Sequence, residues 1–116
     1  MDEYTIYHNP KCGKSRATLA LLTGRGIEPQ IVEYLKTPPS ATELKSIVGK
    51  LGIKPEQLVR KSEDLYKSRY AGKTLSDAQW LEAMAAHPVL IERPIVIAGN
   101  RAVIGRPPEN VETLLR

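Results

Sequence analysis

The sequence has very little cysteine and no long apolar segment. Its 116 residues include one cysteine, Cys12, so an intramolecular disulfide, a four-cysteine zinc site and a dithiol redox motif are excluded. A lone thiol is typical of a protein in a reducing compartment. No apolar segment approaches the roughly 18 residues that a membrane span needs. We therefore expect a cytoplasmic protein that does not associate with membranes.

The sequence also has few aromatic residues and only a small excess of positive charge. Aromatic residues make up 5% of the chain, and 17 Lys and Arg against 13 Asp and Glu give a net charge of +4. Nucleic-acid binders usually carry a dense basic stripe with interleaved aromatic residues, which is absent here. The charge excess points instead to an anionic ligand. The chain length predicts a single domain over residues 1–116, which we expect to be a monomer.

The N-terminal third predicts a strand, a helix and a second strand. Tyr4–His8 favours extended structure and stops at Asn9-Pro10, and good helix formers follow Cys12 as far as Leu22. Gln30–Leu35 is rich in β-branched and aromatic residues. Because a helix connects the two strands, we expect them to be parallel neighbours.

The middle of the chain predicts a helical insertion over residues 40–87. Capping-box patterns begin at Ser40 and Ser76, and each precedes apolar residues at helical spacing. Between these two helices, Lys54–Val59 predicts a short helix and Lys61–Lys73 a loop or broken helix.

The C-terminal part predicts a hairpin and a last helix. Ile95–Ala98 and Arg101–Ile104 are separated by Gly99-Asn100, which suits a type II′ turn, and a helix can begin at Pro107. The complete order predicts an α/β fold of the thioredoxin-like, or glutaredoxin-like, class, in which helices flank a small mixed sheet.

Cys12 is the strongest candidate for a reactive group. At the start of a helix, free N–H groups and the helix dipole favour a thiolate, and Lys11, Lys14 and Arg16 act in the same direction. The same N–H groups, including that of Gly13, can hold an oxyanion. A single cysteine is more often an inert buried residue, but its position and basic neighbours favour a nucleophile.

The residues around Cys12 limit the chemistry further. Gly13-Lys14-Ser15 does not form a phosphate-binding P-loop, because the glycine required five positions earlier is His8. Cys12 and Ser15 form a C-x-x-S pattern, so an external thiol must resolve any covalent intermediate on Cys12. Ser15 is a candidate hydrogen-bond donor to the thiolate, and a protonated His8 could also stabilise it. For both residues a purely structural role remains open.

Several separated segments resemble the glutaredoxin-coupled arsenate reductases of the ArsC type. The similarity runs from about Tyr4 to the C-terminus, and the order of the segments makes it far more specific than C-x-x-S alone. The segments are His8-Asn9-Pro10, Cys12-Gly13, Ser15-Arg16, Tyr34-Leu35, Pro38-Pro39, Leu58-Val59-Arg60-Lys61, His87-Pro88, Leu90-Ile91, Arg93-Pro94-Ile95-Val96 and Arg106-Pro107.

The resemblance implies a catalytic set of Cys12, Arg60, Arg93 and Arg106. In that family the cysteine is the nucleophile, and three arginines hold arsenate or the arsenic-bearing intermediate. Guanidinium groups suit a tetrahedral dianion because their planar fork binds two oxygens at once. The family fold is thioredoxin-like with a helical insertion, and it implies a cis-proline at Pro94 that presents Arg93 to the cysteine.

The implied reaction draws its thiols from other molecules. The Cys12 thiolate attacks arsenate and expels water, glutathione then attacks and reduces the arsenic, glutaredoxin accepts the glutathione, and arsenite leaves after hydrolysis. The resemblance thus implies arsenate or a similar oxyanion as substrate, glutathione as co-substrate and glutaredoxin as partner. It implies no tightly bound cofactor and no metal.

Two other functions fit the same fold. One is a redox-responsive regulator that resembles the Spx proteins and binds RNA polymerase. Those proteins typically use a C-x-x-C switch, which Ser15 removes, and they would leave the three arginines without a role. The other is a different glutathione-linked thiol reductase, since arginines also suit the carboxylates of glutathione.

Overall fold

The computed structural model describes residues 3–115, which form two compact units. Residues 3–37 and 93–115 make the first unit, and Pro38–Glu92 makes the second. The second unit is helical and is inserted between two strands of the first. The predicted helical insertion is therefore confirmed, with bounds slightly wider than residues 40–87.

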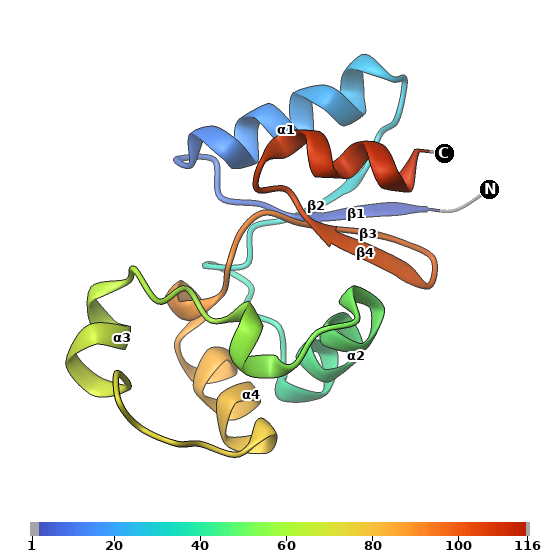
Figure 1. Cartoon of the computed structure of the whole chain (residues 1–116). Helices are drawn as coiled ribbons and strands as arrows, with labels where there is room; N and C mark the ends of the chain where they lie inside the picture. The colour runs from blue at the N-terminus through green and yellow to red at the C-terminus, as the bar shows by residue number, and fades with distance from the viewer. Residues whose placement is uncertain (1–2, 116) are drawn as a thin grey trace. The chain divides into compact units, whose positions relative to one another are not determined.

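A four-stranded mixed sheet is the centre of the first unit (Figure 1). Its strands are β1 (Tyr4–Tyr7), β2 (Gln30–Val32), β3 (Ile95–Ala98) and β4 (Arg101–Ile104), in the spatial order β2-β1-β3-β4. Strand β1 runs parallel to β2 and antiparallel to β3, and β3 is antiparallel to β4. The predicted parallel pair and mixed sheet are both confirmed.

The β3–β4 turn has the predicted geometry. Gly99 has a φ of 61°, and no non-glycine residue between positions 3 and 115 has a positive φ. Asn100 therefore has a negative φ, which distinguishes type II′ from type I′ because type I′ needs positive values at both central residues.

Two helices cover one face of the sheet. These are α1 (Gly13–Gly24) and the 3-10 helix η3 (Pro108–Leu114), which lie beside each other in Figure 1. Burial of apolar side chains between the helices and the sheet supplies the main stabilisation of this layer. Its buried core consists of Ile6, Leu22, Val96, Ala98, Val111 and Leu114.

The second unit contains three α-helices and two 3-10 turns. The α-helices are α2 (Ala41–Leu51), α3 (Asp64–Arg69) and α4 (Asp77–Ala86), and the turns are η1 (Pro55–Leu58) and η2 (Pro88–Leu90). Both predicted capping boxes are present, because the hydroxyls of Ser40 and Ser76 accept hydrogen bonds from the third residue of α2 and α4. No helix within residues 3–115 is long and apolar enough to cross a membrane.

Three elements differ from the sequence-based prediction. Strand β2 ends at Val32 instead of Leu35, because the carbonyl of Glu33 accepts hydrogen bonds from the N–H groups of Lys36 and Thr37 and closes a turn. The short helix predicted at Lys54–Val59 is a 3-10 helix. The last helix is also a 3-10 helix, and it begins at the second of two consecutive prolines, which lack N–H donors.

Candidate active site

Cys12 is the N-cap residue of α1, as its position after the first strand predicts. Its own N–H donates to the carbonyl of Asn9 at 3.0 Å, and its carbonyl accepts from the N–H of Arg16 at 3.0 Å. The N–H groups of Gly13, Lys14 and Ser15 in the first turn have no acceptor within an α-helix. These donors and the positive end of the helix dipole therefore surround the thiol.

Opposing effects act on the pKa of the Cys12 thiol. Burial, which leaves the residue 9% exposed, raises the pKa because it disfavours the charged form. Hydrogen bonds from the N–H of Ser15, the Arg93 guanidinium and the N–H of Lys14 lower it, as does the charge of Arg93. The lowering effects win, so the pKa lies below the usual value of a thiol and a thiolate is favoured.

Arg93 reaches the thiol from the loop that precedes β3. The Arg93–Pro94 peptide is cis, which confirms the geometry that the family resemblance implies. The guanidinium of Arg93 acts directly on Cys12, whereas its Nε atom is buried and has no hydrogen-bond partner within residues 3–115. Arg93 therefore keeps a donor that a bound anion can use.

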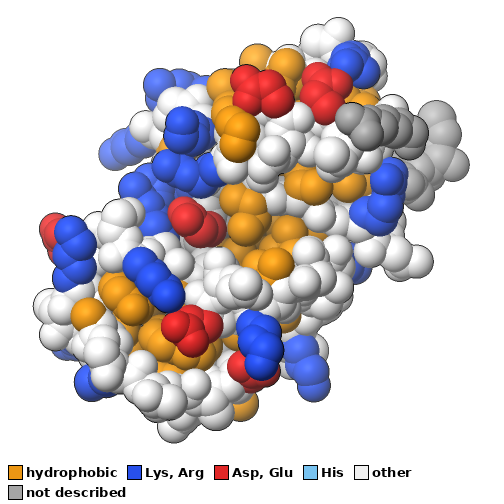
Figure 2. Space-filling model, in the orientation of Figure 1, with side chains coloured by type: hydrophobic (Ala, Val, Ile, Leu, Met, Phe, Trp, Pro, Cys, Tyr) orange, Lys and Arg blue, Asp and Glu red, His pale blue; other side chains and the backbone are white. Residues whose placement is uncertain are grey.

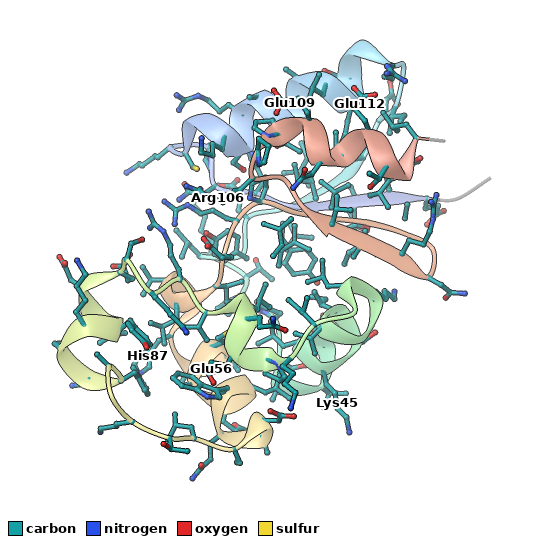
Figure 3. All side chains as sticks on the ribbon, in the orientation of Figure 1. Lys45, Glu56, His87, Arg106, Glu109 and Glu112 are labelled. Atoms are coloured by element: carbon teal, nitrogen blue, oxygen red, sulfur yellow. The ribbon has the colours of Figure 1, made fainter. Side chains whose placement is uncertain are left out.

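Arg106 belongs to the same group of residues but contacts a different atom. It lies between β4 and η3, at the end of the first unit where α1 begins (Figure 3), and its Nη1 donates to the carbonyl of Arg93 at 3.4 Å. The Arg106–Pro107 peptide is also cis, which the sequence did not predict. Arg106 thus supports the backbone of the residue that reaches the thiol.

His8 and Ser15 form a buried pair behind the first turn of α1. The Nδ1 of His8 lies 2.6 Å from the hydroxyl of Ser15, and the N–H of Asn9 donates to the same hydroxyl at 3.0 Å. His8 is 7% exposed and Ser15 is fully buried. The pair ties the end of β1 to the start of α1.

Support of the thiolate by the side chains of His8 and Ser15 stays a prediction, and this pairing bears on it. Burial, aided by the charge of Arg16 and opposed by that of Glu33, lowers the pKa of His8, so the neutral ring is favoured near neutral pH in place of the expected imidazolium. The hydroxyl of Ser15 thus has two hydrogen-bond partners, the ring of His8 and the N–H of Asn9. Ser15 supports Cys12 through its backbone N–H.

Basic side chains surround this end of α1. Lys11, Lys14 and Arg16 are exposed, and Figure 2 shows Lys and Arg side chains gathered over this part of the surface. The Nη1 of Arg16 donates to the carbonyl of Pro10 at 2.9 Å and braces the turn before Cys12. Gly13 has no side chain, so its backbone N–H is the group that can bind an anion. An added Cβ at Gly13 would lie 3.9 Å from Arg16 Nη2.

A small pocket adjoins the turn before Cys12. It has a volume of about 220 Å³ and is lined by His8, Asn9, Pro10, Lys11, Glu33, Leu35 and Lys36. Within residues 3–115 no group of three or more His, Cys, Asp or Glu side chains could hold a metal ion. The groups that act on Cys12 are helix N–H donors and the Arg93 guanidinium.

Arg60 lies in the second unit. Its N–H donates to the carbonyl of Leu90 at 2.7 Å, next to the bridge between Val59 and Ile91. Its Nη1 forms an ion pair with Glu63 at 3.2 Å, in which both side chains are about one quarter exposed. The ion pair with Glu63 was not foreseen from the sequence, and the anion-binding role of Arg60 stays a prediction.

The sequence-based reasoning missed Thr18 and Gly105, which join α1 to the loop that carries Arg93. Thr18 is fully buried, and its hydroxyl donates to the carbonyl of Lys14 at 2.8 Å and approaches that of Gly105 at 3.4 Å. The N–H of Gly105 donates to the carbonyl of Pro94 at 2.8 Å. The one available signal was a glycine that directly follows a predicted strand and stands outside any predicted turn.

Comparisons with known proteins identify the family. The sequence model of the ArsC family matches residues 7–114. The arsenate reductase of Neisseria meningitidis serogroup A is 48% identical over 99% of this chain and 100% of its own, and that of Haemophilus influenzae is 52% identical over 95% and 97%. The structure of the arsenate reductase from Vibrio cholerae superimposes with a TM-score of 0.93 at 50% identity, covering 97% of each chain.

Proposed function

Because the chain belongs to the ArsC family, we propose that it reduces arsenate to arsenite with the Cys12 thiolate as nucleophile. One observation carries the proposal: the lowered pKa of Cys12 results from α1 N–H groups and the Arg93 guanidinium, and these groups also suit an oxyanion. Relatives named arsenate reductases match nearly the whole chain, which favours arsenate among the possible oxyanions.

The first step forms a bond between sulfur and arsenic. The Cys12 thiolate attacks As(V), and one arsenic oxygen leaves as water after it gains protons. Negative charge on the remaining oxygens is stabilised by the first-turn N–H groups and by Arg93. Because the Nε of Arg93 is buried and unpaired within residues 3–115, an arsenic oxygen can satisfy it.

The two other arginines have different proposed tasks. Arg106 holds the Arg93 carbonyl in place and offers its remaining N–H groups to the anion. Arg60 is assigned to the anion by the family resemblance alone, and its ion pair with Glu63 must loosen or adapt for that purpose.

The electrons come from two external thiols. Reduction of As(V) to As(III) takes two electrons, which two thiols supply when they join in one disulfide. We propose glutathione as the thiol that attacks the Cys12 adduct and glutaredoxin as the thiol that accepts the glutathione, after which hydrolysis releases arsenite. Cys12 is the chain's only cysteine, so the protein cannot supply a second thiol itself. The cytoplasm, where glutathione is kept reduced, is the proposed compartment.

A coupled assay tests this proposal. The purified protein is given arsenate with glutathione and glutaredoxin together, with each alone, and with thioredoxin in place of both. We expect arsenite only when glutathione and glutaredoxin are both present, and none from Cys12→Ser. Turnover with thioredoxin alone would reject the proposed donors but keep the arsenate reaction. No turnover with any donor would reject the arsenate reaction. The alternative would then be a different glutathione-linked thiol reductase, whose activity is measured as deglutathionylation of a glutathionylated peptide.

A further inference from the structure

Gly105 lies between Thr18 of α1 and Pro94 of the Arg93 loop, close to both. A Cβ placed on Gly105 would lie 2.5 Å from Thr18 Oγ1, 3.0 Å from Thr18 Cγ2 and 2.9 Å from Pro94 Cγ. Separations under about 3 Å are well inside the usual 3.5–4.0 Å contact distance of heavy atoms. Only glycine fits at position 105 without displacing one of its two neighbours.

Neither neighbour can move easily. Thr18 is fully buried and branched at Cβ, and its hydroxyl is already bonded to the carbonyl of Lys14 one turn earlier in α1. Pro94 is a rigid ring whose carbonyl accepts from the N–H of Gly105 at 2.8 Å. A side chain at position 105 would therefore separate α1 from the Arg93–Pro94 peptide.

The contact of Gly105 with Thr18 and Pro94 bears on the approach of Arg93 to the Cys12 thiol. Cys12 sits at the beginning of α1, and Arg93 directly precedes Pro94, so the spacing at Gly105 sets how closely the guanidinium approaches the sulfur. Gly105 touches neither Cys12 nor a substrate. We propose that Gly105 is a positioning residue whose missing side chain lets α1 and the Arg93–Pro94 peptide approach closely enough for Arg93 to reach Cys12. The proposal rests on Cys12 being the nucleophile proposed above.

Alkylation of Cys12 by iodoacetamide tests the proposal without arsenate. The rate is measured against pH for the wild type, Gly105→Ala, Thr18→Ala and the double variant Gly105→Ala/Thr18→Ala, with folding checked by circular dichroism. Gly24→Ala is the matched control, because Gly24 is also in α1 and its added Cβ meets nothing within 4 Å. A purely structural loss would lower the melting temperature and leave the pH midpoint of the folded protein unchanged.

We expect Gly105→Ala to move the alkylation midpoint to higher pH and to slow the reaction near neutral pH roughly fivefold, the equivalent of about 1 kcal/mol. Gly24→Ala should match the wild type. The double variant should recover part of the lost rate, because it removes both Thr18 atoms that crowd the new methyl group and leaves the contact with Pro94 Cγ.

A wild-type midpoint in folded Gly105→Ala would overturn the proposal, and so would a double variant as impaired as the single one. If Gly105→Ala does not fold, the double variant decides: a folded double variant whose alkylation midpoint lies above that of the wild type supports the contact, and a folded one with the wild-type midpoint refutes it. Failure of the arsenate assay would reject the proposed function but would not affect this test, since alkylation reads only the thiol.

Discussion

Replacement of Arg93 by alanine removes the one side chain that acts directly on the Cys12 sulfur. The guanidinium contributes both a hydrogen bond and a positive charge to the thiolate, whereas the other donors are backbone N–H groups that Arg93→Ala leaves in place. Arg93→Ala therefore separates the contribution of the arginine from that of the helix.

The size of the expected effect follows from these two contributions. A hydrogen bond to a charged group contributes about 1.5–3 kcal/mol. Since about 1.4 kcal/mol in the barrier is a factor of ten, kcat/KM for arsenate should fall roughly 10-fold to 100-fold in Arg93→Ala. The pKa of Cys12 should rise, because its burial remains while a lowering contribution is lost.

Two measurements check this prediction. Arsenate turnover with both thiol donors gives kcat and KM, and the pH dependence of alkylation gives the state of the thiol without substrate. Arg93→Lys keeps the charge but loses the planar fork, so it should recover part of the shift in alkylation and little of the turnover. Arg69→Ala is the matched control, because Arg69 is exposed on α3. Unchanged turnover and alkylation in Arg93→Ala would refute this assignment of Arg93.

Three further predictions follow from the same site. The wild-type alkylation midpoint should lie below the ~8.5 of a free thiol. Since the pKa of Cys12 is lowered, the alkylation rate should fall only as the pH drops through that lowered pKa. A midpoint at or above that of a free thiol would contradict the activated thiolate. Arg60→Ala should lower arsenate turnover at least about tenfold, or ~1.4 kcal/mol. Wild-type turnover in this variant would mean that Arg60 forms the ion pair with Glu63 and does not bind the anion. Ser15→Ala removes a hydrogen-bond partner from the part-buried N–H of Asn9 and from the ring of His8. It should therefore lower the free energy of unfolding in urea by about 1–3 kcal/mol, and an unchanged midpoint would deny the pair its structural role.

Local signals in the sequence predicted most of the fold. Ser40 and Ser76 begin helices because a serine hydroxyl and a residue three positions later satisfy each other's N–H groups, a motif that needs no tertiary contact. The Gly99 turn is likewise set by backbone geometry within the hairpin. Such features depend on neighbouring residues, so they can be predicted from the sequence.

Features that depend on distant residues were predicted poorly. One local feature was also missed: the residues after Val32 have strand composition, yet N–H groups three and four positions after Glu33 bond to its carbonyl and turn the chain. A protonated His8 was one interpretation of its place at the end of the first strand, whereas its burial lowers its pKa and favours the neutral ring. Gly105 faces Thr18, 87 positions away, and no local pattern records that contact.

The three arginines, which the sequence treated as one set, differ in what they contact. Arg93 acts on the thiol, Arg106 holds the carbonyl of Arg93, and Arg60 is paired with the carboxylate of Glu63. These contacts imply different kinetic signatures, because alkylation changes only when a residue acts on the free thiol directly or through Arg93. Arg93 should affect alkylation and turnover together, and Arg106 should affect alkylation weakly through the placement of Arg93. Arg60 should affect arsenate turnover while the alkylation profile stays that of the wild type, so the two assays together assign each arginine to the thiol or to the anion.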